Sequence, residues 1–138
     1  MEVRISSEAL AAIRAHAASD PEREVCGLLF GDDDHVSAVT PAPNVAPDPA
    51  KHFEIDPAAL FAAIRGERAG GARLVGYYHS HPGGRAEPSA TDQAHAAPDG
   101  KLWLIVAGTE VRGFRSCIDG LQPIALSRLC NESCTGLT

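Results

Sequence analysis

Two histidines and an aspartate occur at a spacing that can hold a metal ion. His79 and His81 follow an apolar segment, residues 74–78, that is typical of a strand, and Asp92 comes after a loop rich in proline and glycine. Successive side chains of a strand point to opposite faces, so we expect the two imidazoles on one face and Ser80 on the other. Three protein ligands are one fewer than a closed tetrahedral zinc site needs, which leaves room for a water molecule.

The spacing has to be weighed against chance and against an ordinary structural role. Six histidines in 138 residues give roughly 0.26 His-x-His triplets by chance, so the pair alone is weak and fits ordinary strand-end residues. Requiring Ser89 and Asp92 at their offsets lowers this expectation to on the order of 0.001. Residues 89–92 also have the composition of a helix N-terminus, with Ser89 as the N-cap. The two interpretations are compatible, because a capped helix start is a rigid place for a ligand.

A hydrolytic zinc site also needs a base. A zinc ion held by two imidazoles and one carboxylate retains a water molecule and lowers its pKa to about 7. A base must take a proton from that water and return it to the leaving amine. The chain has no His-Glu-x-x-His motif, so we expect the base elsewhere in the sequence. Glu24, beside an apolar segment where partial burial would raise its pKa, is the best candidate, and Glu22, Glu54 and Glu87 remain alternatives.

Composition and charge narrow the class of protein. The chain has 138 residues, of which 44% are hydrophobic and 22% charged, as expected of one globular domain over residues 1–138. Its net charge of −6 and its pI near 5.4 argue against nucleic acid or an anionic membrane as the main partner. No apolar run approaches the length of a membrane span, and the N-terminus lacks the features of a signal peptide. We therefore expect a cytoplasmic protein.

Four cysteines raise the question of disulfides or a second metal site. They are Cys26, Cys117, Cys130 and Cys134. A reducing cytoplasm keeps such residues as free thiols. Cys130 and Cys134 are separated by three residues, but no other Cys or His stands near them at zinc-finger spacing, so a second metal site is only a weak alternative.

The hydrophobic pattern predicts strands and helices that alternate along the chain. Helices are expected over residues 7–18, 57–69 and 89–97, with Leu60, Phe61 and Ile64 on the apolar face of the second. Strands are expected over residues 3–5, 24–31, 36–40, 52–55, 74–78, 102–107, 111–118 and 121–126. Residues 41–51 contain four prolines and form a surface loop, and the tail from Ser127 has no clear pattern. The sequence thus predicts an α/β layered domain with a mixed sheet of six to eight strands.

These residues resemble the motif of the JAMM, or MPN-plus, zinc metalloprotease family. The family pattern is an upstream glutamate, then His-Ser/Thr-His, seven residues and Ser-x-x-Asp. Here His79-Ser80-His81 is followed by seven residues, Ser89, two further residues and Asp92, and residues 24–27 match the family's Glu-x-Cys-Gly segment. The resemblance covers nearly the whole chain and departs at no motif position. It implies a single MPN-like, cytidine-deaminase-like domain with a mixed, curved β-sheet flanked by about three helices.

The resemblance also implies the roles of the site residues. His79, His81 and Asp92 would hold one zinc ion per chain. Glu24 would be the general acid and base acting on the zinc-bound water, which is the nucleophile, and Ser89 would stabilise the tetrahedral oxyanion. Ser80, on the opposite face, would have a packing or supporting role. His95, one helical turn after Asp92, is expected on a solvated helix face.

The substrate class follows from the same resemblance. The family cleaves peptide or isopeptide bonds after the C-terminal Gly-Gly of ubiquitin and ubiquitin-like proteins. Compact members are similar to bacterial or archaeal hydrolases that release cysteine or another amine from a sulfur-carrier protein of ubiquitin-like fold. A Gly-Gly tail would bind by strand addition to a sheet edge, and we expect residues near 44–55 and 83–85 to line its groove. The enzyme would act as a monomer or homodimer.

Three other kinds of protein have to be compared with a zinc peptidase. A non-catalytic MPN scaffold that binds a ubiquitin-like partner would have lost a ligand or the glutamate, and none is missing. A zinc nucleoside deaminase would need His-x-Glu and Pro-Cys-x-x-Cys, which the chain does not contain. A purely structural zinc protein would unfold on chelation rather than only lose activity.

Overall fold

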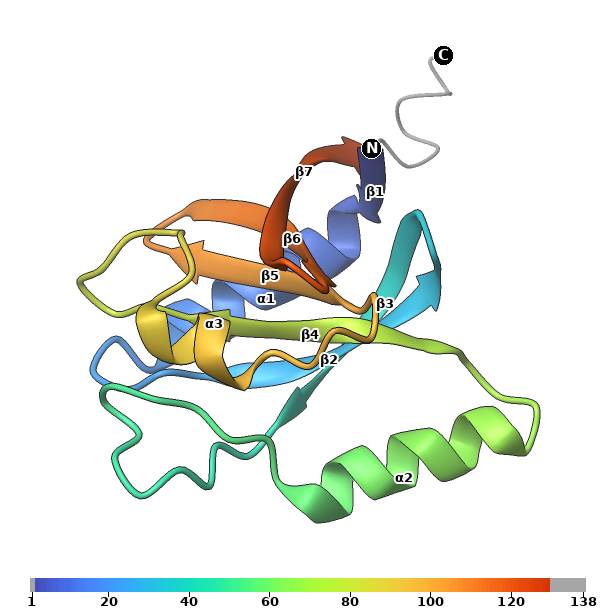
Figure 1. The fold of residues 1–138 in the computed structure, drawn as a ribbon, viewed down its shortest axis with the longest axis horizontal. Coiled ribbons are helices and arrows are strands. Elements are labelled where there is room, and N and C mark those ends of the chain that lie inside the picture. The colour runs from blue at the N-terminus through green and yellow to red at the C-terminus, as the bar shows by residue number, and fades with distance from the viewer. Residues whose placement is uncertain (1, 130–138) are drawn as a thin grey trace.

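The computed structural model describes residues 2–129, in which three helices and seven strands alternate (Figure 1). In chain order the elements are β1 (Glu2–Ser6), α1 (Ser7–Ser19), β2 (Cys26–Asp32), β3 (His35–Ala42), α2 (Pro57–Arg68), β4 (Leu74–Ser80), α3 (Ala90–His95), β5 (Leu102–Ala107), β6 (Glu110–Cys117) and β7 (Gly120–Leu129). The N-caps of α1 and α2 are Ser6 and Asp56, whose side chains accept backbone N–H groups of the first turn, as expected of these residue types.

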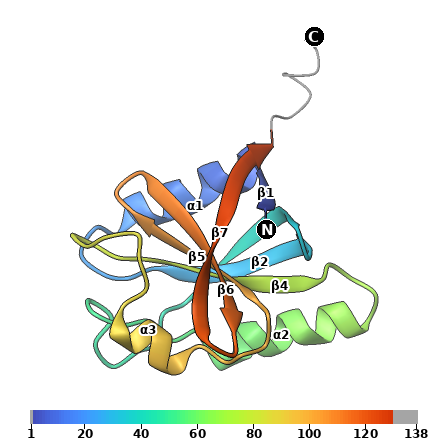
Figure 2. The same ribbon diagram turned by 45° about the horizontal axis from the view of Figure 1, so that its top comes forward.

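The strands of the described chain form one mixed sheet that closes on itself. Their order is β1-β3-β2-β4-β5-β6-β7, and β1 pairs in parallel with both β3 and β7. The other neighbours are antiparallel except β4 and β5, which are parallel because the segment containing α3 crosses over between them. The expected α/β fold with a mixed, curved sheet and three helices is confirmed. The pairing of β1 with β7, which completes the closure (Figure 2), could not be anticipated from local patterns.

Two hydrophobic clusters lie on opposite faces of β5. Leu102, Leu104 and Val106 join the larger cluster, which includes the buried side of α1. Trp103 and Ile105 belong to the smaller cluster on the other face. A nearly continuous apolar strand is expected where both faces are covered, and here the pattern has that cause. β5 is therefore buried on both faces, and its carboxyl end lies beside that of its parallel neighbour β4.

The expected strand over residues 52–55 is wrong. Only a single bridge, between Asn44 and Ile55, is present there. The Asn44 side chain takes the place of a strand partner, because its amide bonds to the carbonyl of His52 and to the N–H of Glu54. Backbone groups satisfied by a side chain have no need of a ladder.

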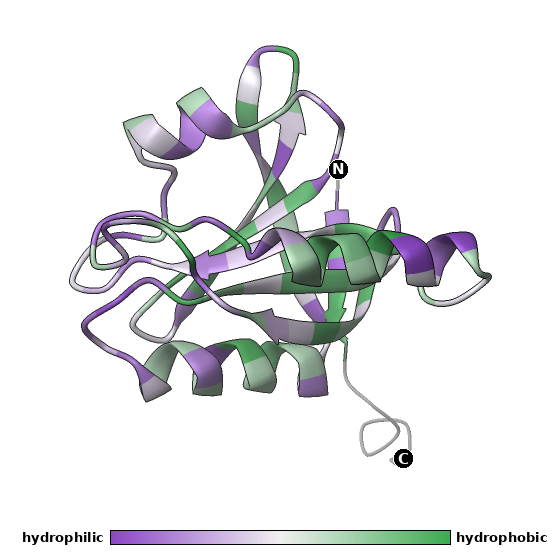
Figure 3. Cartoon of the chain, turned by 90° about the horizontal axis from the view of Figure 1, so that it is seen from below, coloured by the Kyte–Doolittle hydropathy of each residue, from purple (hydrophilic) through white to green (hydrophobic). Residues whose placement is uncertain are grey.

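Two helices differ from expectation in extent or burial. α3 ends at His95 because Ala96 is extended, at φ −70° and ψ 121°, and Pro98 disfavours helix at the residue before it. The apolar residues of α2 form no buried face, since none of its residues is buried and Phe61 is 66% exposed. α2 lies beside β4 outside the closed sheet, and its hydrophilic C-terminal end projects from the molecule (Figure 3).

Two further expectations concern membranes and cysteines. No helix among residues 2–129 is both long and apolar enough to cross a membrane. Cys26 and Cys117 are free thiols, as expected, and Cys130 and Cys134 lie outside the described residues. Burial, aided by the charge of Glu24, raises the pKa of Cys26 to about 12, so its thiol stays protonated and unreactive.

Candidate metal centre

The two candidate imidazoles stand at the carboxyl end of β4. His79 is fully buried between β2 and β5, opposite Cys26 and Ile105 respectively. His81 follows the last residue of β4 and is half-buried. Its backbone N–H donates to the carbonyl of Val106. The two side chains lie on one face, as strand alternation predicts, and their Nε2 atoms are 3.1 Å apart. Because β4 is central, its neighbours fix this end of the strand from both sides.

The carboxylate of Asp92 completes a triangle with the two imidazoles. Its Oδ2 lies 3.1 Å from Nε2 of His79 and 3.1 Å from Nε2 of His81. Tetrahedral zinc bonded at about 2.0–2.1 Å places its ligand atoms roughly 3.4 Å from one another, close to the observed separation. A single cation between the three atoms can be bound by all of them at once. The donor set and its spacing therefore fit zinc.

A hydrogen bond selects the tautomer of His81 that a metal requires. Nδ1 of His81 lies 2.8 Å from the carbonyl oxygen of Arg85, which can only accept, so Nδ1 carries the proton. In the neutral ring, Nε2 is then free to bind a metal ion, whereas in the protonated ring it donates to Asp92. A hydrogen bond of this kind normally orients a metal-binding histidine and makes it more basic.

Asp92 reaches the site from the first turn of α3. Ser89 is the N-cap: its Oγ accepts the Asp92 N–H at 3.0 Å, and its own N–H donates to Asp92 Oδ2 at 3.0 Å. This reciprocal pair is a capping box, in which the third helical residue returns to the cap. The same oxygen of Asp92 thus caps the N-terminus of the helix and faces both imidazoles. Helix cap and candidate ligand site are one arrangement.

Burial and hydrogen bonding set the ionisation of the triangle. Burial lowers the pKa of His79, more strongly than its contact with Asp92 raises it. Burial also opposes the charge on His81, but hydrogen bonds to Asp92 and Arg85 prevail and raise its pKa. Asp92 is held well below its usual pKa, since hydrogen bonds from both imidazoles and from Ser89 outweigh its burial. The site therefore favours an ionised carboxylate beside a neutral His79, the forms that bind a metal ion.

Glu24 comes to the same place from the chain just before β2. One carboxylate oxygen of Glu24 and one ring nitrogen each of His79 and His81 all lie within 4.8 Å of one another. Glu24 is buried, and its Oε1 has no hydrogen-bond partner among the described residues. Burial, with the charge of Asp92 adding to it and that of His81 opposing it, raises the pKa of Glu24 from 4.5 to about 7. An unpartnered carboxylate poised near neutrality has the properties of a general base.

The other three candidate glutamates are exposed. Glu22 and Glu54 face solvent, and Glu87 forms surface ion pairs with Arg85 and Arg112. None of them belongs to the metal-capable group that contains Glu24. Burial therefore distinguishes Glu24 from its rivals, in agreement with the motif resemblance, whereas the local sequence argument had left all four glutamates open.

The remaining motif residues have supporting positions. Ser80 points away from the imidazoles, and its Oγ accepts the Val25 N–H at 2.9 Å, which ties β4 to the residue after Glu24. A side chain on Gly27 would overlap the ring of Tyr78, so only glycine allows β2 to pack this closely there. His95 is exposed, and its side chain lines the cavity that opens beside Asp92. The supporting role expected of Ser80 agrees with this geometry.

Two residues of the segment expected to line the substrate groove also touch the metal site, which the sequence did not indicate. Phe53 stacks on His79 with ring centroids 4.1 Å apart, and Asn44 donates a hydrogen bond to the backbone carbonyl of Glu24 at 2.8 Å. Both lie in the proline-rich segment between β3 and α2. No local pattern marks them, because their partners are far away in the sequence.

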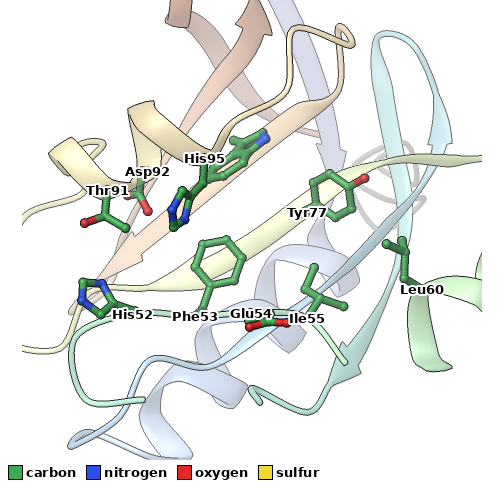
Figure 4. A pocket seen from close by; sticks show the side chains of 10 residues that line it. His52, Phe53, Glu54, Ile55, Leu60, Tyr77, Thr91, Asp92 and His95 are labelled. Atoms are coloured by element: carbon green, nitrogen blue, oxygen red, sulfur yellow. The ribbon is translucent and has the colours of Figure 1, made fainter. Parts of the chain in front are cut away.

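A mostly apolar cavity of about 260 Å³ opens beside Asp92 (Figure 4). Its wall includes residues 52–55, which are part of the segment predicted to line a substrate groove, together with Tyr77, Trp103 and Leu60 of α2. Gly83, which was expected in the same groove, instead lines a separate cavity beside Ser80 and His81. The open face next to the candidate ligands is thus walled by the segment before α2 and by α3.

The closed mixed sheet, its helices and this constellation define a hydrolase of the JAMM/MPN class. The family model for prokaryotic homologs of the JAB domain matches residues 6–117, and the chain belongs to that family. The family resemblance read from the motif is thereby confirmed.

Relatives and one solved structure agree with this assignment. The chain is 43% identical over 94 residues to the desampylase of Haloferax volcanii, covering 67% of this chain and 68% of that protein. It is 37% identical over 102 residues to the probable TtuB-protein conjugate cleaving protease of Thermus thermophilus, covering 73% and 67%. The solution structure of protein DSY2949 from Desulfitobacterium hafniense superposes with a TM-score of 0.80 at 28% identity over 94% of both chains.

Proposed function

We propose that this protein is a zinc-dependent peptidase that hydrolyses the peptide or isopeptide bond after the C-terminal Gly-Gly of a ubiquitin-like or sulfur-carrier protein. The observation that carries the proposal is the triangle of His79 Nε2, His81 Nε2 and Asp92 Oδ2, with 3.1 Å edges, beside the buried carboxylate of Glu24. A scaffold that only binds partners has no need of a complete ligand set and an unpartnered base. One zinc ion per chain would account for the three ligands of the triangle and for the base beside it.

The roles of the residues follow from their positions. His79, His81 and Asp92 would hold the ion, which when bound lowers the pKa of a coordinated water to about 7 and polarises the scissile carbonyl. Glu24, with its pKa near 7, takes a proton from the attacking water on a carboxylate oxygen and delivers it to the leaving amine. The hydroxyl of Ser89 accepts the Asp92 N–H and keeps its own hydrogen free to donate to the developing oxyanion.

The substrate class is inferred from the relatives and from the cavity. A desampylase and a TtuB-conjugate cleaving protease are named for removing ubiquitin-like proteins from conjugates. An extended tail entering the cavity beside Asp92 would pass between residues 52–55 and α3, and glycines fit where side chains would collide. We propose residues 1–138 as a single catalytic domain in the cytoplasm, where the free thiols of Cys26 and Cys117 stay reduced.

The test uses zinc-loaded protein and a panel of carrier proteins fused after their Gly-Gly tail to a reporter. Mass spectrometry should find cleavage directly after the second glycine. Glu24→Gln should retain stoichiometric zinc but lose turnover by about 100-fold or more, since it cannot accept a proton. Glu22→Gln, an exposed neighbour with the same change of charge, is the matched control and should cleave normally. Normal turnover by Glu24→Gln would remove Glu24 from the mechanism.

A further inference from the structure

The proline-rich segment of residues 43–56 contacts both the proposed base and one proposed ligand. Its organising side chain is Asn44, whose amide makes four hydrogen bonds. Oδ1 of Asn44 accepts the N–H groups of Ala46 and Glu54, each at 3.0 Å. Nδ2 donates to the carbonyls of Glu24 at 2.8 Å and His52 at 3.0 Å. The amide is thus saturated, and one side chain both folds the segment and attaches it to Glu24.

A backbone hydrogen bond strengthens the attachment to Glu24. The Glu24 N–H donates to the carbonyl of Pro49 at 2.7 Å. Both backbone groups of Glu24 are therefore held by residues 43–56. Because Glu24 precedes β2 and gains no ladder partner there, this segment, together with the bonds between Val25 and Ser80, holds the backbone from which its carboxylate projects.

The same segment reaches His79 through Phe53. The Phe53 and His79 rings are stacked, with an interplanar angle of 19°, and Trp103 packs edge-on against both at 5.7 Å. Nδ1 of His79 is buried and has no hydrogen-bond partner among residues 2–129. A metal-binding histidine is usually oriented by a hydrogen bond from its second ring N–H to a carbonyl or carboxylate. His79 makes no such bond to the described residues. Aromatic packing takes its place.

We propose that Asn44 is a positioning residue for the metal centre. Its amide holds residues 43–56 in the shape that keeps Phe53 on the ring of His79 while anchoring the backbone of Glu24. The inference rests on the proposed function for the roles of Glu24 and His79. The base, from the chain before β2, and the ligand, from β4, are thereby aligned by a third, otherwise irregular segment.

Asn44→Asp tests this inference with the least change of shape. Oδ1 can still accept from Ala46 and Glu54, but the second oxygen faces the carbonyls of Glu24 and His52 and cannot donate to them. We expect zinc affinity, measured by competition with a chromophoric chelator, to fall about 10- to 100-fold, as for loss of a residue that orients a ligand. Turnover should fall mainly through kcat. Ile118→Ala, which shortens a strongly exposed side chain outside residues 43–56, is the control and should leave both unchanged.

Trp103 supplies a readout that needs neither substrate nor metal. It is the single tryptophan of the chain and touches both rings of the stack. In the metal-free protein, its emission should shift to longer wavelength in Asn44→Asp as Phe53 leaves its place. Phe53→Leu keeps the Asn44 hydrogen bonds and should lower zinc affinity in the same way. Phe53→Tyr keeps the aromatic ring and should have the zinc affinity of the wild type.

Zinc affinity, Trp103 emission and melting temperature together decide whether Asn44 positions the metal centre. Wild-type zinc affinity and Trp103 emission in folded Asn44→Asp and Phe53→Leu would overturn the proposal. A lower melting temperature with unchanged zinc affinity of the folded protein would also overturn it, because Asn44 would then only stabilise the loop. If the zinc-loaded wild type cleaves no Gly-Gly carrier, the proposed function fails, yet the affinity and fluorescence measurements still decide the role of Asn44.

Discussion

Replacing Glu24 by glutamine should change how the stability of the metal-free protein depends on pH. Burial raises the pKa of Glu24 from 4.5 to about 7 in the folded state, so folding favours its protonated form. The stability that this preference contributes is fully present below pH 4.5 and is lost as the pH rises toward about 7. Glutamine resembles the protonated side chain and does not titrate. The stability of Glu24→Gln should therefore not fall over this pH range through titration at position 24.

The size of the effect follows from the two pKa values. A tenfold change in proton affinity corresponds to about 1.4 kcal/mol, so the interval from 4.5 to about 7 amounts to about 3 kcal/mol. Between about pH 5 and pH 8, the free energy of unfolding of Glu24→Gln should rise by about 2–3 kcal/mol relative to wild type. His81 and Asp92 are present in both proteins, and comparing the two proteins removes the part of their contributions that does not depend on Glu24.

Urea unfolding in the presence of a chelator, followed by the fluorescence of Trp103, measures this difference. Glu22→Gln controls for the change in overall charge. A difference between Glu24→Gln and wild type that stays within about 0.5 kcal/mol from pH 5 to pH 8 would refute the reasoning, because Glu24 would then titrate alike in both states. A difference of opposite sign would mean that the positive charge of His81 dominates over burial.

Four further perturbations, three substitutions and removal of the metal, test the site. His81→Ala and Asp92→Ala should each lower zinc affinity by more than about 100-fold, measured by metal analysis after dialysis, and an unchanged zinc content would refute the ligand assignment. Ser89→Ala should lower stability by about 1 kcal/mol through loss of the helix cap and lower kcat by about 100-fold or more; if activity per folded molecule holds, Ser89 only caps α3. Chelation should abolish hydrolysis while circular dichroism still shows cooperative unfolding, because neither hydrophobic cluster includes a proposed metal ligand; unfolding on chelation would mark the zinc as structural.

Local features of the site could be predicted because their causes lie within a few residues. The placement of His79 and His81 on one face follows from strand alternation, and the cap formed by Ser89 and Asp92 spans four residues. The buried strand β5 was evident from its continuous apolar run. The strand expected over residues 52–55 failed for the opposite reason, since the side chain of Asn44 had already taken its backbone partners.

The metal-ligand motif, its candidate chemistry and the order of most elements were thus determined by the sequence itself. The tertiary structure explains how Glu24, which the motif singles out 55 residues before His79, reaches the histidines, because antiparallel pairing sets Cys26 opposite His79 and brings Glu24 alongside. It also decided the pKa of Glu24, which depends on burial by residues distant in the chain. The contacts of Phe53 and Asn44, and the closure of the sheet by β1 and β7, likewise depend on long-range register. Local patterns encode which side chains can bind a metal, whereas packing determines what surrounds them.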